Sequence, residues 1–193
     1  MRKILILDGH PAKESYVSAL CDAYATGATA SGFEVRRLNI RDLTFDSNLR
    51  LGYQQIQELE PDLRQAQEHI GWCEHLVFAF PMWWGSMPAR TKGFFERCWL
   101  PGFAFKYRED SPLWDRLLAG RSARLIVTSD APVLFNVLAY WNAPYITVRK
   151  MIFRFCGFKP VKTTAIGGVK GLPLAARQRW LDHVQERLGA PGR

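Results

Sequence analysis

Short apolar runs that alternate with segments of helical periodicity constrain the fold of this chain most strongly. The clearest example is residues 75–80, a branched and aromatic run that stops at a proline and is followed by helical spacing over residues 89–99. Similar runs occupy residues 3–7, 33–39, 123–128 and 158–166, and helical spacing occupies residues 16–30, 61–72, 145–155 and 172–188. Strands that alternate with helices predict a mostly parallel sheet with helices on both faces.

Five such strands predict an α/β, three-layer, doubly wound sheet of the flavodoxin-like type, with strand order 2-1-3-4-5. The chain of 193 residues is long enough for one core, so we expect one domain over residues 1–193. Between these elements, residues 40–60 are expected to form a long connection with a little helix. Residues 133–144 are aromatic and are expected to break at Pro144. The last helix is expected to bury Leu174, Trp180 and Val184.

Composition excludes several classes of protein. The chain is 48% hydrophobic and 23% charged, which is ordinary for a globular protein. No apolar stretch approaches the ~20 residues of a membrane span, and the first apolar run ends at Asp8, too early for a secretory signal. We therefore expect a cytoplasmic protein without membrane insertion. The four cysteines have no metal-ligand spacing, so neither a metal site nor a disulfide framework is predicted.

The net charge of +8 is spread along the chain and does not form one block. Such a distribution favours a solvated surface that attracts phosphorylated cofactors, and it would also suit an acidic partner. No nucleic-acid motif accompanies the charge, so no nucleic-acid partner is expected.

Three of the predicted strands end in unusual loops, at residues 10–15, 81–86 and 128–132. In the strand order 2-1-3-4-5 the first, third and fourth strands are neighbours. Their loops therefore converge at the carboxyl edge of the sheet, where ligands of such folds bind. The three loops together predict one site.

The first of these loops leads into a helix that Ser15 can cap. A helix N-terminus offers unpaired N–H groups and a positive dipole end to a phosphate, and the Ser15 hydroxyl could contribute. Ser15 alone can also be interpreted as a simple helix cap. His10 could donate to the phosphate or pack against a ring. Neither a G-x-G-x-x-G motif after the first strand nor a P-loop motif is present, which argues against those nucleotide sites.

The second loop places Trp83 and Trp84 between prolines, beside Gly85. Two tryptophans in such a loop favour a wall for a flat ligand over a hydrophobic plug. A phosphate site next to a flat aromatic surface suits a flavin, whose ring could receive the N–H groups of these three residues. Thr128 and Ser129, in the third loop, could bind the pyrimidine end of the ring or be ordinary turn formers.

Motifs along nearly the whole chain resemble one enzyme family. They are G-H-P-x-x-x-S-Y at residues 9–16, F-P-M-W-W-G-S-M-P-A at 80–89, K-G-F-F-E-R at 92–97, G-F-A-F at 102–105 and F-C-G-F at 155–158. In this order they resemble the NAD(P)H:quinone oxidoreductases of flavodoxin-like fold. That group includes DT-diaphorase, the modulators of drug activity and the ancillary subunits of potassium efflux systems.

The resemblance implies a flavin-dependent enzyme that reduces quinones or similar flat acceptors by ping-pong hydride transfer through flavin N5. It implies FMN, or alternatively FAD, as the cofactor, NADPH or NADH as the electron donor, and a homodimer. It assigns cofactor binding to a set of residues in the three loops and one helix. These are His10, Ser15, Tyr16, Gln67, Pro81, Met82, Trp83, Trp84, Gly85, Thr128 and Ser129.

Two departures from the family pattern leave alternatives open. Asp130, Ala131 and Pro132 replace the glycines of the family's third loop, and residues 133–155 contain no histidine, whereas the family has a Tyr and a His there. The catalytic residues are therefore unassigned, with Tyr140 or Asn142 as candidate substitutes. One alternative function is a regulatory subunit of a potassium efflux transporter, and the other is a redox-silent binding module.

Overall fold

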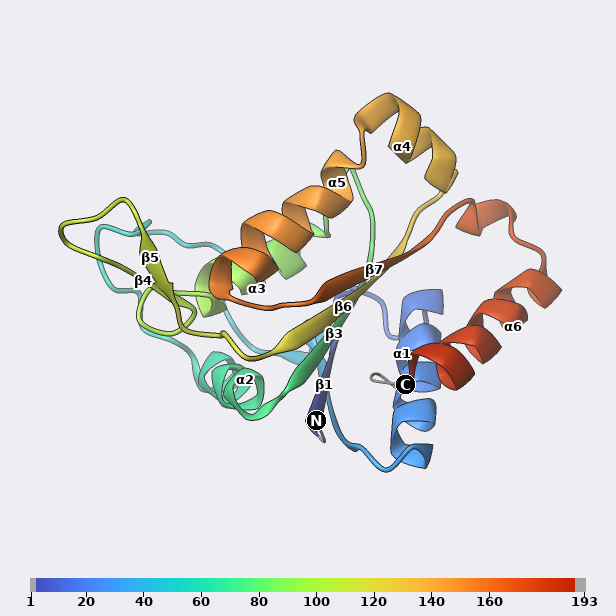
Figure 1. Ribbon diagram of the computed structural model, residues 1–193, viewed down its shortest axis with the longest axis horizontal. Helices are drawn as coiled ribbons and strands as arrows, with labels where there is room; N and C mark the ends of the chain where they lie inside the picture. Colours follow the sequence, from blue (N-terminus) through green and yellow to red (C-terminus); the bar gives the residue numbers. More distant parts are fainter. Residues whose placement is uncertain (1–2, 190–193) are drawn as a thin grey trace.

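A parallel sheet of five strands forms the centre of the computed structural model, which describes residues 3–189 (Figure 1). The strands are β1 (Lys3–Asp8), β2 (Glu34–Asn39), β3 (His75–Pro81), β6 (Ser122–Thr128) and β7 (Val161–Ile166). Their order in the sheet is β2-β1-β3-β6-β7, and every neighbouring pair is parallel. The flavodoxin-like α/β class and the predicted strand order are confirmed.

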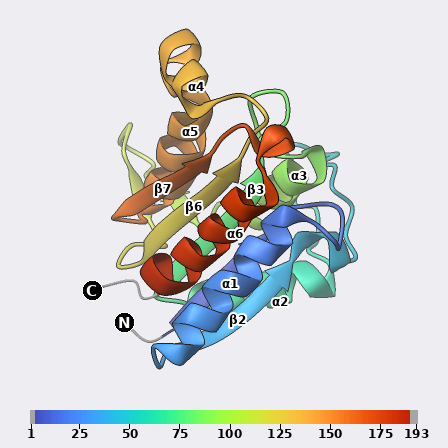
Figure 2. The same ribbon diagram turned by 90° about the vertical axis from the view of Figure 1, so that its right-hand side faces the viewer.

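Helices cover both faces of this sheet. They are α1 (Tyr16–Ala30), α2 (Pro61–Trp72), α3 (Ala89–Cys98), α4 (Val133–Tyr140), α5 (Ala143–Ile146), α6 (Leu174–His183), the 3-10 turns η1 (Ile40–Asp42) and η3 (Val169–Gly171), and the π-helical segments η2 (Thr147–Arg154) and η4 (Val184–Leu188). Helices α1 and α6 lie side by side on one face (Figure 2). Within the described residues, no helix is long and apolar enough to cross a membrane.

The alternation of side chains along β1 decides which of two cores each residue joins. Leu5 and Leu7 pack in the core beneath α2 and α3, whereas Ile4 and Ile6 pack in the core beneath α1 and η4. Because successive side chains of a strand point to opposite faces, a strand that is buried on both faces must be apolar throughout. This explains why the sequence shows continuous apolar runs.

A buried arginine anchors the long connection between β2 and α2. Arg97, in α3, is wholly buried. Its Nη2 donates to Glu60 Oε2 at 2.9 Å and to the Glu58 carbonyl at 2.7 Å, and its Nη1 donates to the Asp46 carbonyl at 3.1 Å. The connection between β2 and α2 contains, among the described residues, only the short turn η1 as regular structure, so the guanidinium of Arg97 holds it in place.

Two expectations about the helices are wrong. The break after α4 comes at Trp141 and Asn142, both with positive φ, and Pro144 lies in the first turn of α5. Proline is tolerated there because the first N–H groups of a helix have no partner within it. Leu174 is 84% exposed, although Trp180 and Val184 pack against the core as expected.

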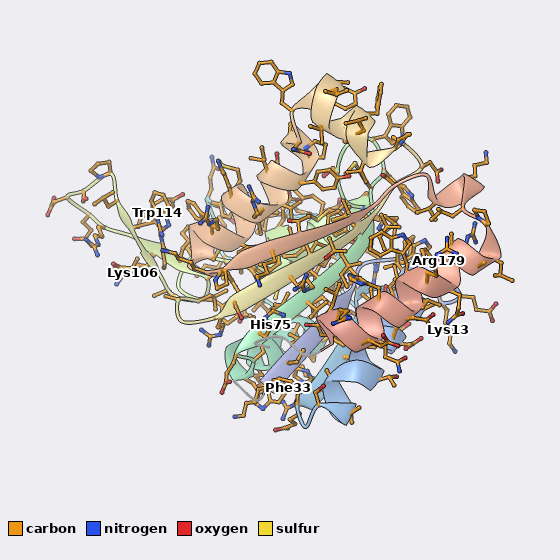
Figure 3. All side chains as sticks on the ribbon, turned by 45° about the vertical axis from the view of Figure 1, so that its right-hand side comes forward. Lys13, Phe33, His75, Lys106, Trp114 and Arg179 are labelled. Atoms are coloured by element: carbon orange, nitrogen blue, oxygen red, sulfur yellow. The ribbon has the colours of Figure 1, made fainter. Side chains whose placement is uncertain are left out.

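Two expectations about strands also need correction. The last strand begins at Val161, later than the predicted residue 158. In addition, no strand was expected between residues 100 and 121, yet this segment contains an antiparallel pair, β4 (Phe105–Tyr107) and β5 (Trp114–Arg116). This hairpin projects from the body of the protein, as the positions of Lys106 and Trp114 show (Figure 3). The Trp114 indole stacks on the Phe155 ring, with the ring centroids 4.4 Å apart, and its Nε1–H donates to the Phe155 carbonyl at 2.8 Å.

Candidate functional site

The carboxyl ends of β1, β3 and β6 border one cavity of about 780 Å³. These strands are neighbours in the sheet, as predicted, and their loops are joined by the Met82 N–H, which donates to the Thr128 carbonyl at 2.7 Å. Most of the residues assigned to the cofactor line this cavity, namely His10, Tyr16, Pro81, Met82, Trp83, Trp84, Gly85, Thr128 and Ser129. The volume lies within the range of about 300–1,000 Å³ that is typical of cofactor sites.

The N-terminus of α1 borders the cavity at Tyr16 and Val17. Ser15 is the N-cap, and its Oγ accepts the Ser18 N–H at 3.1 Å. Ser15 itself does not line the cavity, so its side chain acts as the simple cap that was one of the two interpretations. The N–H groups of Tyr16 and Val17 cannot pair within the helix and remain available to an anion.

A buried carboxylate fixes the loop that leads into this helix. Asp8 is fully buried, and its Oδ2 accepts hydrogen bonds from Ser18 Oγ at 2.7 Å, Arg37 at 2.8 Å and Arg41 at 2.9 Å. Its Oδ1 accepts the His10 N–H at 3.0 Å. Burial by itself raises the pKa of Asp8, but the hydrogen bonds from these four groups hold that pKa below its usual value. From the sequence, Asp8 was identified only as the end of an apolar run, and its hydrogen-bond network was not predicted.

His10 connects the first loop with the tryptophan loop. Its Nδ1 accepts the Ala12 N–H at 3.0 Å, which places the proton of a neutral ring on Nε2. The ring meets Trp83 edge-on, with the centroids 5.9 Å apart. Two roles were considered for His10, donation to a phosphate and packing against a ring. The ring packs against Trp83, and its Nε2–H could still donate to a ligand.

The tryptophan loop is a tight turn with an unusual backbone. The Trp83 N–H donates to the Ser86 carbonyl at 2.8 Å, and the Ser86 N–H donates to the Trp83 carbonyl at 2.9 Å. The central residues have positive φ, 51° at Trp84 and 71° at Gly85, as in a type I′ turn. Glycine adopts this conformation freely, whereas a tryptophan there carries strain of roughly 1–2 kcal/mol.

This turn changes the expected set of hydrogen-bond donors. The N–H of Trp83 is used within the turn, and only those of Trp84 and Gly85 have no partner among the described residues. Trp84 is fully exposed and Trp83 is about half exposed, so the pair does not form a plug over the core. Both residues line the cavity.

The third loop is tied to the segment that follows β7. Asp130 Oδ1 accepts the Lys170 N–H at 3.1 Å, so this carboxylate binds main chain. The Ser129 hydroxyl donates to the Ala131 carbonyl at 2.8 Å and thus acts as a turn former. The Thr128 hydroxyl, by contrast, has no partner among the described residues and is left for a ligand in the cavity that Thr128 lines.

Of two residues near the site that do not line the cavity, Gln67 was expected to bind the cofactor and Arg177 was not. Gln67, assigned to the flavin by resemblance, lies on α2, where its Nε2 donates to the Cys98 carbonyl at 2.8 Å, and it does not line the cavity. Arg177, which the sequence did not single out, lies 5.9 Å from the Tyr16 ring. The Tyr16 hydroxyl donates to the Arg177 carbonyl at 3.1 Å, and Arg177 Nη2 donates to the Val169 carbonyl at 3.0 Å.

Helices α4 and α5 supply a wall of the cavity that the sequence did not predict. Its residues are Phe135, Asn136, Tyr140, Ala143 and Pro144, with Thr147 from the start of η2 and Val169 from the segment after β7. Tyr140, one of the two candidate substitutes for the absent Tyr and His, is among them, and Asn142 is not. A sequence signal was present, since residues 133–148 carry no charge.

Helix α4 projects from the sheet at the top of Figure 1 and has an inverted pattern of burial. Leu134 and Leu138 are 66% and 69% exposed, whereas Asn136 is the one buried residue of this helix. A helix on the surface of a protein usually buries its apolar side chains and exposes its polar ones. An exposed apolar patch beside a cavity is typical of an interaction surface.

The polar groups of the cavity fit a flavin mononucleotide. The N-terminus of α1 suits its phosphate, and the N–H groups of Trp84 and Gly85 suit the polar edge of its ring. The Thr128 hydroxyl offers a third polar contact at the end of β6, and the aromatic side chains nearby suit the faces of the ring.

Comparison with known proteins places this geometry in a family. The family model described as "Flavodoxin-like fold" matches residues 2–188. NAD(P)H dehydrogenase [quinone] 1 of Rattus norvegicus is 23% identical over 214 aligned positions, which cover 97% of this chain and 77% of the rat protein.

Two solved structures have the same architecture. NAD(P)H:quinone oxidoreductase from Methanothermobacter marburgensis is 22% identical, with a TM-score of 0.80 and 98% of both chains covered. An FMN-dependent NADH-azoreductase from Bacillus anthracis, in complex with FMN, is 17% identical, with a TM-score of 0.73 and 98% of both chains covered. This chain therefore belongs to the flavodoxin-like fold family and is a distant homologue of the NAD(P)H quinone oxidoreductases.

Proposed function

We propose that this protein is a flavin-dependent NAD(P)H oxidoreductase that reduces quinones or similar flat electron acceptors. One observation carries the proposal: a single cavity combines a helix N-terminus with a tryptophan turn whose central N–H groups have no partner in the part of the chain that the structure describes. The first feature suits a phosphate and the second suits the edge of a flat heterocycle. The relatives described above as quinone oxidoreductase and azoreductase support the same activity.

Each part of the cavity has a role in this proposal. The N–H groups of Tyr16 and Val17 bind the phosphate, and the positive charge of Arg177 nearby favours an anion. The N–H groups of Trp84 and Gly85 bind the edge of the ring. A bound flavin supplies two-electron hydride transfer through its N5 in a ping-pong sequence, from NADPH or NADH and then to the acceptor.

FMN is the proposed cofactor in preference to FAD. The N-terminus of α1, a helix of 15 residues, lines the cavity and suits a single phosphate group. The first residues of α5 also line it, but that helix has only four residues and a proline in its first turn. The azoreductase of similar fold, in complex with FMN, supports this choice. We assign no side chain as a catalytic acid, because hydride transfer to and from a flavin does not require one.

We also propose that the protein is a cytoplasmic homodimer. The exposed apolar side chains of α4 lie beside the cavity, and a second copy that covers them would shield both patch and cavity from water. The four cysteines are buried and unpaired, which suits a reducing compartment. Sedimentation of Leu138→Asp should show monomer. Leu174 is also exposed but lies on α6, so Leu174→Asp should remain dimeric.

The test of the function is a visible spectrum. The purified chain should acquire a flavin absorbance band on incubation with FMN, and addition of NADPH or NADH without oxygen should bleach it. Addition of a quinone should then restore the band. Mass spectrometry of the extracted cofactor distinguishes FMN from FAD. Weak flavin affinity together with no oxidation of NADPH would instead favour the redox-silent binding module.

A further inference from the structure

Asn136 is the most unusual residue of the cavity wall. It belongs to a helix whose neighbouring side chains are apolar and exposed, yet it is only 3% exposed itself. Burial of an amide is unfavourable unless its hydrogen bonds are satisfied. The sequence position of Asn136 is therefore not explained by the stability of α4 alone, since an apolar residue would be easier to bury there.

One hydrogen bond fixes the Asn136 side chain. Its Nδ2 donates to the hydroxyl of Tyr145 at 3.2 Å, and Tyr145 is itself buried. An asparagine amide has two N–H donors and a carbonyl acceptor. After the bond to Tyr145, one N–H and the Oδ1 atom have no partner among the described residues. Because Asn136 lines the cavity, these groups are available to a ligand there.

We propose that Asn136, oriented by Tyr145, is the residue that selects electron acceptors with a carbonyl group on the edge of a flat ring. This inference rests on the proposed function and specifies how the same cavity recognises its second substrate. The remaining N–H of Asn136 donates to the carbonyl oxygen of a quinone. Its Oδ1 accepts the O–H of the corresponding hydroquinone.

The amide suits both oxidation states of such an acceptor without a change of charge. Reduction of a quinone by two electrons and two protons converts a ring carbonyl, which accepts a hydrogen bond, into a hydroxyl, which can donate one. An asparagine provides both complementary groups and does not titrate. The wall formed by α4 and α5 is otherwise mostly apolar, with Phe135, Ala143 and Pro144 available to contact the ring.

The test compares two ligands that share a ring system. Menadione carries two carbonyl groups on a methylnaphthalene frame, and 2-methylnaphthalene carries none. Their affinities for the FMN-loaded protein are measured by quenching of tryptophan fluorescence, for the wild type, Asn136→Leu, Tyr145→Phe and the control Val137→Ala. Val137 is on the same helix and does not line the cavity. The KM and kcat for menadione and the affinity for FMN are measured in parallel.

Asn136→Leu should weaken menadione binding about fivefold, the worth of one neutral hydrogen bond, and leave 2-methylnaphthalene binding unchanged. Its KM should rise at nearly constant kcat, and FMN affinity should stay within twofold of the wild type. Tyr145→Phe should give a smaller loss with the same selectivity, and Val137→Ala should give none. Tyr145→Phe also tests the proposal if Asn136→Leu fails to fold.

If Asn136→Leu lowers the affinity for menadione and for 2-methylnaphthalene equally, Asn136 only maintains the shape of the cavity. If it lowers neither affinity, Asn136 takes no part in recognition. Either result overturns the inference while FMN binding by the wild type stands. A wild-type chain that binds no flavin would instead refute the proposed function, and the inference would fall with it.

Discussion

Replacement of Trp84 by asparagine should stabilise the flavin-free protein, although the residue lies in the proposed site. Trp84 has φ of 51°, and its side chain is fully exposed, so substitution sacrifices no buried surface. A left-handed backbone costs most residues roughly 1–2 kcal/mol, whereas asparagine tolerates it, and Asn-Gly is a preferred pair for a type I′ turn. We expect the free energy of unfolding to rise by about 1 kcal/mol.

Trp141 provides a matched control. It has the same φ of 51° and is also mostly exposed, but it does not line the cavity. Urea unfolding of Trp84→Asn and Trp141→Asn should give similar gains, and the melting temperature should rise by about 2–4 °C per kcal/mol. Only Trp84→Asn should weaken FMN binding, about fivefold if one aromatic contact is lost.

The unfolding midpoints should be measured at two protein concentrations. If the tryptophan side chain packs in a dimer interface, the change in unfolding midpoint that its replacement causes will depend on protein concentration. A gain at Trp141 with no gain at Trp84, at both concentrations, would refute the argument that the turn is strained. Equal loss of FMN affinity in both variants would refute the assignment of Trp84 to the flavin site, because Trp141 does not line the cavity.

Three further predictions concern stability. Burial, and then the charges of Arg124 and Lys162, lower the pKa of His75 from 6.5 to about 4. The unfolded state therefore binds the proton first as pH falls, and the free energy of unfolding should drop by about 3 kcal/mol between pH 6.5 and 4; urea titrations of His75→Gln should lack this drop. Arg97→Met leaves a carboxylate and two carbonyls without their donor and should cost about 3 kcal/mol, with faster hydrogen exchange over residues 46–58. In Gly167→Ala the new Cβ would lie 2.6 Å from the Val133 nitrogen and should cost about 1–3 kcal/mol in urea unfolding, whereas Gly171→Ala, with open space around it, should be neutral.

The parts of the fold that the sequence predicted are those set by local pattern. Helices α1 and α2 have the expected bounds, and the sheet order followed from the alternation of apolar runs with helices. The convergence of the three loops followed in turn from that order, because the carboxyl ends of neighbouring parallel strands meet at one edge.

The parts that the sequence did not predict depend on contacts between distant segments. The hairpin of β4 and β5 has strands of three residues each, and its anchor is the contact of Trp114 with Phe155. The Asp8 network joins β1 to Arg37 and Arg41, which looked like members of a dispersed positive charge. The Trp83 N–H is unavailable to a ligand because it donates to the Ser86 carbonyl. That hydrogen bond depends on the positive φ at the centre of the turn, which a tryptophan rarely adopts.

The two sides of the cavity are built differently, and this has a consequence for its chemistry. The side formed by the strand loops is fixed by buried groups, with Asp8 beneath the first loop and the Met82 hydrogen bond between the second and third. The side formed by α4 carries exposed apolar residues, and its one buried residue, Asn136, is held by a hydrogen bond to the Tyr145 hydroxyl. Changes in α4 should therefore alter which acceptor enters and how quickly it leaves, while the groups that suit a flavin phosphate and ring keep their positions.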